Sequence, residues 1–192
     1  TPTNATNAAA ANRSAFDQGR VVVALNLQAS DFELFGLPEQ FALDPKALDA
    51  QWKALQRETH PDKFAAQGAV AQRLAMQWSV RVNEAYQRLK NPTQRAAYLC
   101  ERRGAPVNAE RNTAMPPAFL MQQMEWREEL EEASGEEVLE ALLDRTQDAR
   151  RDTLTRIASL LDQQHDATAA ATQVRALMFV ERFAAEVEQR LD

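Results

Sequence analysis

The sequence has few of the residues that build disulfides, zinc sites and tight turns. Glycine occurs 5 times in 192 residues, aromatic residues make up 7 %, and the only cysteine is Cys100. One cysteine excludes an internal disulfide and a cysteine-rich zinc site, and it fits a reducing, cytoplasmic compartment. No stretch alternates with period two beyond a few residues, while Ala, Leu, Gln, Glu and Arg abound. These helix-forming residues predict an all-α fold.

The usual signs of an enzyme are also missing. No serine or cysteine lies in a recognisable nucleophile motif, and the sequence has no glycine-rich phosphate loop. The two histidines, His60 and His165, are far apart in the sequence, which argues against a metal site. His165 lies in a polar turn, where we expect a solvated side chain. We therefore expect no enzyme activity, no metal and no other cofactor.

Charge and hydropathy disfavour nucleic acid and membrane as binding partners. The formal net charge is −6, which disfavours nucleic acid as the ligand. The longest apolar runs are far shorter than the roughly 20 residues that span a bilayer, so we expect no membrane segment. Residues 1–18 have no apolar core of a secretory signal. We predict that residues 1–28 form a disordered tail, although Val21–Leu25 resembles a strand without a partner.

Proline and glycine divide the rest of the chain into helical segments. The proline-rich stretch 105–117 is predicted to be a linker between an N-terminal domain, residues 29–104, and a three-helix bundle, residues 118–192. Asp31 and Asp44 are expected to cap the first two helices. The predicted helices are 32–35, 45–59, 69–90, a short segment ending near Gly104, and then 119–132, 136–163 and 167–191.

The stretch Thr59–Lys63 separates the two long helices of the N-terminal domain. Pro61 disfavours helical geometry at the preceding His60, so the first helix should end there. Apolar residues repeat at helical spacing on both helices, which predicts an antiparallel hairpin with residues 59–68 as its loop. The loop would display the imidazole of His60, the ring of Pro61 and the carboxylate of Asp62.

Two basic residues of the first long helix lie off its apolar stripe. Lys53 and Arg57 are four residues apart and therefore share one face. From the pattern alone, this face is either an ordinary solvated surface or a binding patch.

The helix predicted at 119–132 has two apolar stripes where one would suffice for a core. At about 100° per residue, Phe119, Trp126 and Leu130 fall within one narrow wedge. A second side carries apolar residues edged by carboxylates: Leu120, Met121, Met124, Glu125, Glu128 and Glu132. This second side is either buried, for example under the first domain, or an exposed surface for a protein partner. Methionine suits an adaptable contact, and a rim of glutamates would orient a basic partner.

Phe179 presents the same choice on the last helix, since it projects away from the stripe of Leu177, Val180, Ala184, Val187 and Leu191. It is an ordinary surface residue, or it packs under the linker, or it extends the second side of helix 119–132.

These segments together resemble a J domain followed by a helical domain. The motifs that carry the resemblance, in chain order, are Asp31-Phe32-x-x-Phe35-Gly36-Leu37, Leu48-x-x-x-Trp52-x-x-Leu55, His60-Pro61-Asp62-Lys63-Phe64, Asn83-x-Ala85-Tyr86-x-x-Leu89 and Arg95-Ala96-x-Tyr98-Leu99. Phe64, the Phe-Gly-Leu-Pro start and the run Phe119–Leu130 are similar to the HscB family, the J-domain co-chaperones of iron–sulfur cluster assembly. Met124 departs from that pattern, where leucine is usual.

The resemblance implies a non-enzymatic adaptor. The tip formed by His60, Pro61 and Asp62 would stimulate ATP hydrolysis by a DnaK-type chaperone, HscA, with Lys63 beside it. Lys53 and Arg57 would dock on that chaperone, which favours the binding-patch interpretation of their face. The second side of helix 119–132, together with Phe179, would bind the scaffold protein IscU.

Two other functions remain open at this stage. The chain could be a general J-domain co-chaperone whose bundle binds other clients or dimerises. It could also be a helical regulator bound to DNA or ribosomes, which would show a steep salt dependence of polynucleotide binding.

Overall fold

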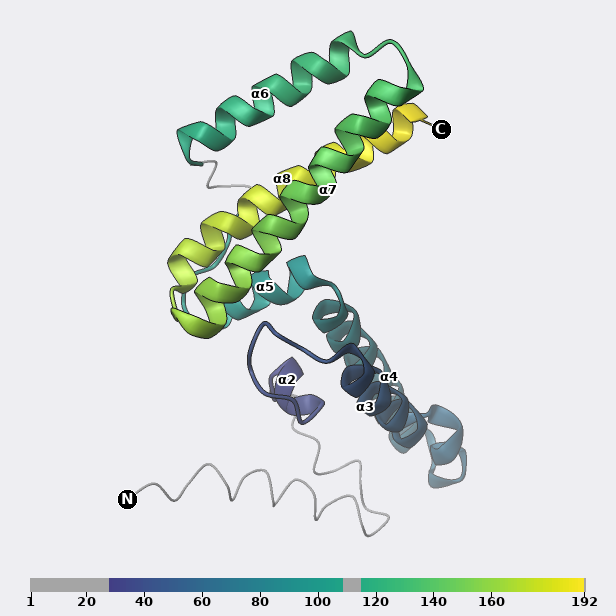
Figure 1. Ribbon diagram of the computed structural model, residues 1–192. Helices are drawn as coiled ribbons and strands as arrows, with labels where there is room; N and C mark the ends of the chain where they lie inside the picture. Colours follow the sequence, from purple (N-terminus) through teal and green to yellow (C-terminus); the bar gives the residue numbers. More distant parts are fainter. Residues whose placement is uncertain (1–27, 109–114, 192) are drawn as a thin grey trace, which may run out of the picture. The chain divides into compact units, whose positions relative to one another are not determined.

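A computed structural model describes residues 28–108 and 115–191 (Figure 1). All regular structure within these residues is helical, which confirms the predicted all-α class. The predicted tail, with Val21–Leu25, lies outside the described residues except for Gln28. The elements are α2 (Asp31–Leu34), α3 (Pro45–Thr59), the 3-10 helix η3 (Pro61–Gln67), α4 (Ala69–Lys90), α5 (Pro92–Arg102), α6 (Pro117–Glu132), α7 (Glu136–Ala158), the π-helix η4 (Ser159–Gln163) and α8 (Ala167–Leu191).

The chain forms two compact units. Among the described residues, unit 1 comprises 28–39 and 43–90, and unit 2 comprises 40–42 with 91–108 and 115–191. Helix α5, which the sequence analysis grouped with the N-terminal domain, belongs to unit 2 because it packs on α8. Thr93 of α5 donates a hydrogen bond to Glu181 of α8 at 2.8 Å. The predicted linker 105–117 lies partly outside the described residues and remains a prediction.

Unit 1 is built on the predicted helical hairpin. Helices α3 and α4 pack along each other, and the rings of Trp52 and Tyr86 stack at 4.4 Å between centroids. Asn83 of α4 accepts hydrogen bonds from the side chains of Trp52, at 3.0 Å, and Gln56, at 2.5 Å. Trp78, Val82, Ala85 and Leu89 of α4 are almost completely buried. These contacts lock the register of the two helices that carry the tip.

The short helix α2 closes one side of this hairpin, with Phe32 and Phe35 buried as expected. The predicted cap was wrong: Ser30 is the N-cap residue, and it forms a reciprocal capping box with Glu33. Asp31 instead lies fully buried, with its carboxylate 2.7 Å from Arg81 and 2.8 Å from Arg88 of α4. The ion pairs explain why this acid tolerates burial, since an isolated buried carboxylate is strongly unfavourable.

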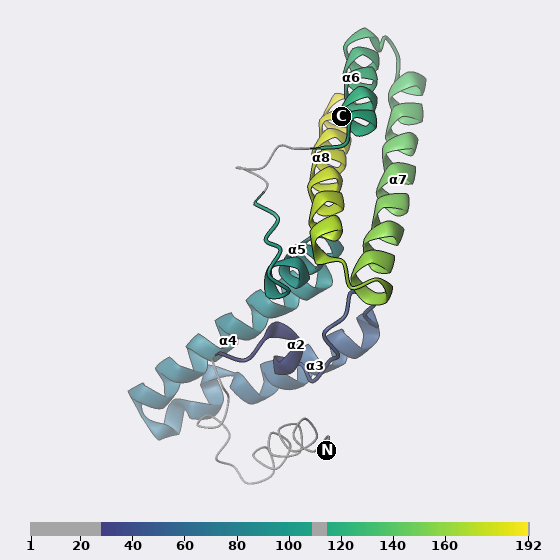
Figure 2. The same cartoon turned by 90° about the vertical axis from the view of Figure 1, so that its left-hand side faces the viewer.

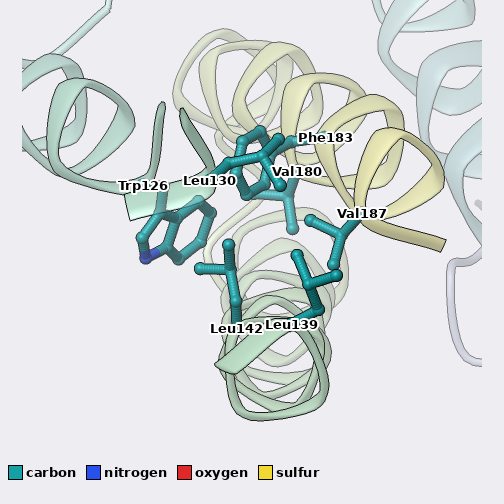
Figure 3. Close-up of a cluster of buried hydrophobic side chains, with 7 residues drawn as sticks. All are labelled: Trp126, Leu130, Leu139, Leu142, Val180, Phe183 and Val187. Atoms are coloured by element: carbon teal, nitrogen blue, oxygen red, sulfur yellow. The ribbon is translucent and has the colours of Figure 1, made fainter. Parts of the chain in front are cut away.

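Unit 2 contains the predicted three-helix bundle of α6, α7 and α8 (Figure 2). Its core brings together residues from all three helices, drawn in Figure 3: Trp126, Leu130, Leu139, Leu142, Val180, Phe183 and Val187. Cys100 of α5 is also buried, and burial raises the pKa of its thiol to about 11. Within the described residues no helix is long and apolar enough to cross a membrane.

The predicted helix 136–163 is continuous but changes its geometry near the end, since α7 passes into the π-helix η4 at Ser159. The wider turn directs Asp162 toward the 40–42 segment, and its carboxylate accepts the backbone N–H groups of Phe41, at 2.7 Å, and Ala42, at 2.8 Å. Arg95 lies over the Phe41 ring, 4.9 Å from its centroid. These contacts hold residues 40–42 in unit 2.

The buried carboxylate of Asp31 provides a test of unit 1. Asp31→Ala should lower the free energy of unfolding of this unit by about 3 kcal/mol, because it leaves Arg81 largely buried without its counter-ion. Guanidinium denaturation, together with hydrogen exchange of the α4 amides, would measure the loss. The control Asp152→Asn alters an exposed residue and should stay within about 0.5 kcal/mol of wild type. An unchanged stability in Asp31→Ala would contradict a structural role for these ion pairs.

Candidate functional site

The tip of the hairpin displays the residues that the sequence analysis selected. His60 is the C-cap of α3 and the N-cap of η3, and its backbone is extended, with φ −63° and ψ 125°. The side chains of His60 and Asp62 are 59 % and 89 % exposed. His60 Nδ1 accepts the backbone N–H of Asp62 at 3.3 Å and lies 3.5 Å from the Asp62 carboxylate. An imidazole and a carboxylate are therefore presented together in a defined local geometry.

The tip is more ordered than the loop that the sequence predicted. Residues Pro61–Gln67 form a 3-10 helix that packs on α4, and Phe64 is buried beneath it. Proline at the first helical position pre-sets φ and needs no hydrogen-bond acceptor, so it starts η3 directly after α3 ends. Gly68 follows with φ +94°, a conformation that other residues rarely adopt, and allows the turn into α4.

The basic face beside the tip is exposed on α3. Lys53, Arg57 and Lys63 are all exposed, and Arg57 Nε donates to the Lys53 carbonyl at 3.2 Å. Lys46 is also exposed and lies seven residues before Lys53, so it falls on the same side of α3. Lys46 was not predicted from the sequence, although the spacing of 46, 53 and 57 indicates a shared face.

One acid lies within this basic surface. Partial burial raises the pKa of Glu58, while the nearby charges of Lys63 and Arg57 oppose that rise. Its raised pKa means that the neutral form of Glu58 is favoured relative to a freely solvated glutamate.

The second side of α6 is exposed to solvent within unit 2. The exposed fractions are 44 % for Leu120, 63 % for Met121 and 64 % for Met124. The three glutamates predicted beside them, Glu125, Glu128 and Glu132, are also exposed. In contrast, Trp126 and Leu130 of the other stripe are buried in the bundle (Figure 3). Within unit 2, these six residues are therefore not part of the core, and their role as a partner surface stays a prediction.

Phe179 occupies an intermediate position. It is half-buried and belongs to a row of aromatic rings that starts in the core. Trp126 stacks on Phe183 at 5.5 Å, Phe183 stacks on Phe179 at 6.3 Å, and Phe179 meets the edge of Phe119 at 5.8 Å. The expectation that Phe179 projects away from the core was thus only partly right, because one face of its ring packs on the bundle.

Two residues of this region were not predicted from the sequence. Phe183 is 1 % exposed and lies at the centre of the aromatic row. It follows Val180 by three residues and Phe179 by four, a spacing that could have identified it. The guanidinium of Arg127 lies over the Phe179 ring, 5.8 Å from its centroid, and no spacing rule would have predicted that contact.

The described residues contain no group of three or more histidine, cysteine or acidic side chains placed to hold a metal ion. His165, which we expected to be solvated, is exposed, with its backbone in the left-handed region at φ +56°. The candidate surfaces are a polar tip with a basic flank in unit 1, and an apolar, acid-edged face in unit 2.

Comparison with known proteins identifies close relatives. Residues 115–188 match the family model described as the HSCB C-terminal oligomerisation domain. The co-chaperone protein HscB homologue of Burkholderia thailandensis is 53 % identical over 171 residues, covering 88 % of this chain and 97 % of the relative. The homologue of Burkholderia mallei is 52 % identical with the same coverage.

Solved structures agree with these relatives. The chaperone HscB from Vibrio cholerae superposes with a TM-score of 0.73 at 39 % identity, covering 84 % of this chain and 97 % of that one. Human co-chaperone protein HscB gives a TM-score of 0.82 at 23 % identity over 87 % of this chain and 84 % of that one, which shows a shared fold.

The anchoring of the tip leads to a prediction. Phe64→Ala should remove the main apolar contact of η3 and destabilise the tip locally by roughly 3 kcal/mol. We expect faster hydrogen exchange of the amides from Asp62 to Gln67, with little change in α7. Gln67→Ala, an exposed change in the same segment, should leave exchange as in wild type. Equal exchange rates in Phe64→Ala and wild type would show that Phe64 does not hold the tip.

Proposed function

This chain belongs to the HscB family of co-chaperones, and from that membership we propose that it stimulates the ATPase of an HscA-type chaperone and delivers an IscU-type scaffold to it during iron–sulfur cluster assembly. The single observation that carries the proposal is the tip, where His60 and Asp62 are exposed on either side of the half-buried Pro61 at the end of the hairpin. Such a tip acts by changing the conformational equilibrium of its partner, so it needs a fixed shape and no bond chemistry of its own.

The basic flank supplies the docking surface for the chaperone. Lys53, Arg57 and Lys63 are exposed next to the tip, and Lys46 extends their side of α3 by about two turns. Clustered cations accelerate encounter with an acidic partner and fix its orientation. We propose that these residues contact an acidic face of the chaperone's nucleotide-binding domain. We propose that the protein acts in the cytoplasm, together with this ATP-dependent chaperone.

The apolar face of unit 2 supplies the scaffold-binding surface. Leu120, Met121 and Met124 are exposed on α6. Phe179 of α8 lies next to this helix, because its ring contacts the ring of Phe119 of α6. Exposed contiguous apolar residues that are rimmed by charge are typical of protein interfaces. Glu125, Glu128 and Glu132 would form the acidic rim that orients a basic surface of the scaffold.

Self-association through the bundle is a second candidate function for the same face. It is favoured by the description of the matched C-terminal family as an oligomerisation domain. Sedimentation of the protein alone and with scaffold separates the two possibilities. If the apolar face binds the scaffold, the sedimenting species should be a one-to-one complex, whereas a self-associating face would give dimers that the scaffold does not enter.

The tip can be tested with an isosteric change. Asp62→Asn should abolish stimulation of the HscA ATPase while leaving the fold and scaffold binding intact, because the 89 % exposed carboxylate supports no buried contact. Steady-state ATP hydrolysis with and without scaffold measures the effect. Asp144→Asn, an exposed substitution in α7, is the matched control. Full stimulation of the HscA ATPase by Asp62→Asn would contradict the proposed role of the tip.

The apolar face can be tested by truncation. Leu120→Ala combined with Phe179→Ala should weaken scaffold affinity by on the order of 2–4 kcal/mol, because interface anchors of this kind dominate binding. Isothermal titration calorimetry measures the affinity, and thermal unfolding verifies that the bundle tolerates the change at Phe179. The control is Val138→Ala, since Val138 of α7 is 43 % exposed, close to the 44 % of Leu120. Wild-type affinity in the folded double variant would place the scaffold site elsewhere.

A further inference from the structure

Glu58 lies at the border between the basic flank and the buried side of α3. At about 100° per residue, Lys46, Lys53 and Arg57 fall within about 40° of one another on this helix. Glu58 lies about 100° from Arg57, on the side toward the buried residues of α3. It also precedes His60 by two residues, so it lies where the flank and the tip meet.

The Glu58 carboxylate is poorly satisfied for a charged group. Its side chain is half-buried, and Oε2 is buried without a hydrogen-bond partner among the described residues. A buried oxygen without a donor is unfavourable, and more so when it carries charge. Desolvation accordingly raises the pKa of Glu58, although Lys63 and Arg57 stabilise its charged form. The charged form therefore depends on these two cations.

We propose that Glu58 sets the strength of chaperone docking: its negative charge opposes the approach of an acidic surface, and docking is accompanied by the uptake of one proton by its carboxylate. This inference rests on the proposed role of the basic flank. An acidic partner that covers the flank engages Arg57 and Lys63, brings negative charge close to Glu58 and removes water from it. All three changes favour the neutral acid, so the carboxylate binds a proton from solvent.

The neighbouring charges leave this role to Glu58. The cations that act on it are Arg57 of its own helix and Lys63 of η3. Helix α4 packs on both α3 and η3. Of its charged residues, Arg73 lies on the side opposite the buried residues of that helix, and Arg81 pairs with the buried carboxylate of α2. Removal of the Glu58 charge therefore changes the potential at this border of the flank.

The first experiment compares a neutral isostere with a matched control. Glu58→Gln should lower the concentration needed for half-maximal stimulation of the HscA ATPase by about 3-fold at low ionic strength, and the difference should vanish at roughly 0.5 M salt, where charges are screened. Maximal stimulation should stay as in wild type, because the tip is unchanged. Glu84→Gln makes the same change in net charge at an exposed acid of α4 and should remain within about 1.5-fold of wild type. An unchanged thermal midpoint establishes that the variants are folded.

Proton uptake is a readout that a purely structural role of Glu58 would not change. Isothermal titration calorimetry of HscA binding in two buffers of different ionisation enthalpy should show proton uptake by the wild type and less uptake by Glu58→Gln. Because the neutral form docks better, wild-type docking should tighten as the pH falls toward the raised pKa of Glu58, and docking of Glu58→Gln should tighten less. His60 and Asp62 are present in both proteins, so the difference belongs to Glu58.

Each other outcome rejects the inference in a recognisable way. An unchanged or higher half-maximal concentration in Glu58→Gln would mean that this charge does not oppose docking. Equal effects of Glu58→Gln and Glu84→Gln would indicate a general effect of net charge. A changed maximal stimulation alone would place Glu58 in the action of the tip, and equal proton uptake by both proteins would reject its protonation. Stimulation by the wild type leaves the proposed function intact in all these cases, whereas its absence would reject both proposals.

Discussion

The ring of Pro61 is the constraint on which the tip of unit 1 depends. It forces His60 into extended geometry, so that α3 ends at Thr59 and η3 starts at Pro61 itself. A flexible loop at this place would have to be ordered whenever it met a partner, at the expense of binding free energy. Because η3 is anchored by Phe64 and followed by Gly68 in its unusual conformation, the tip has its shape before any partner arrives. A short motif in a fixed frame can therefore act on another protein's equilibrium.

Unit 2 solves a different physical problem, which is to keep apolar side chains exposed on a stable helix. Helix α6 buries Trp126 and Leu130 in the bundle, so its second stripe is free to face solvent. The aromatic row from Trp126 through Phe183 to Phe179 connects the core to this surface and holds Phe179 in one position. Exposed methionines adapt to a partner, whereas a ring fixed by its neighbours contributes shape. The face thus combines adaptable and rigid contacts.

Several tertiary contacts could not be predicted from local sequence patterns. Asp31 was expected to cap α2, but its carboxylate is buried against Arg81 and Arg88, fifty and fifty-seven residues away in sequence. A capping signal is local, while an ion pair of this kind depends on how α2 lies on α4. Helix α5 was grouped with the N-terminal domain because the proline-rich stretch 105–117 that follows it was predicted to be the linker, yet α5 packs on α8. Asp162 falls within the predicted helix 136–163, and no local pattern shows that the π-helix η4 directs its carboxylate to two backbone N–H groups of the 40–42 segment.

The sequence alone determined the class of fold and the bounds of α3, α4 and α8. It also determined the break at His60 and Pro61 and the existence of a second apolar stripe on α6. These features follow from helical periodicity and proline geometry, which are local properties. It also determined the family, since the tripeptide and its flanking helices are specific. Only the tertiary structure decided whether that stripe is buried, how far Phe179 is exposed, and which side chain lies over its ring. Burial and ring contacts depend on what the neighbouring helices bring to each position, and for Arg127 that neighbour is α8, which begins forty residues further along the chain.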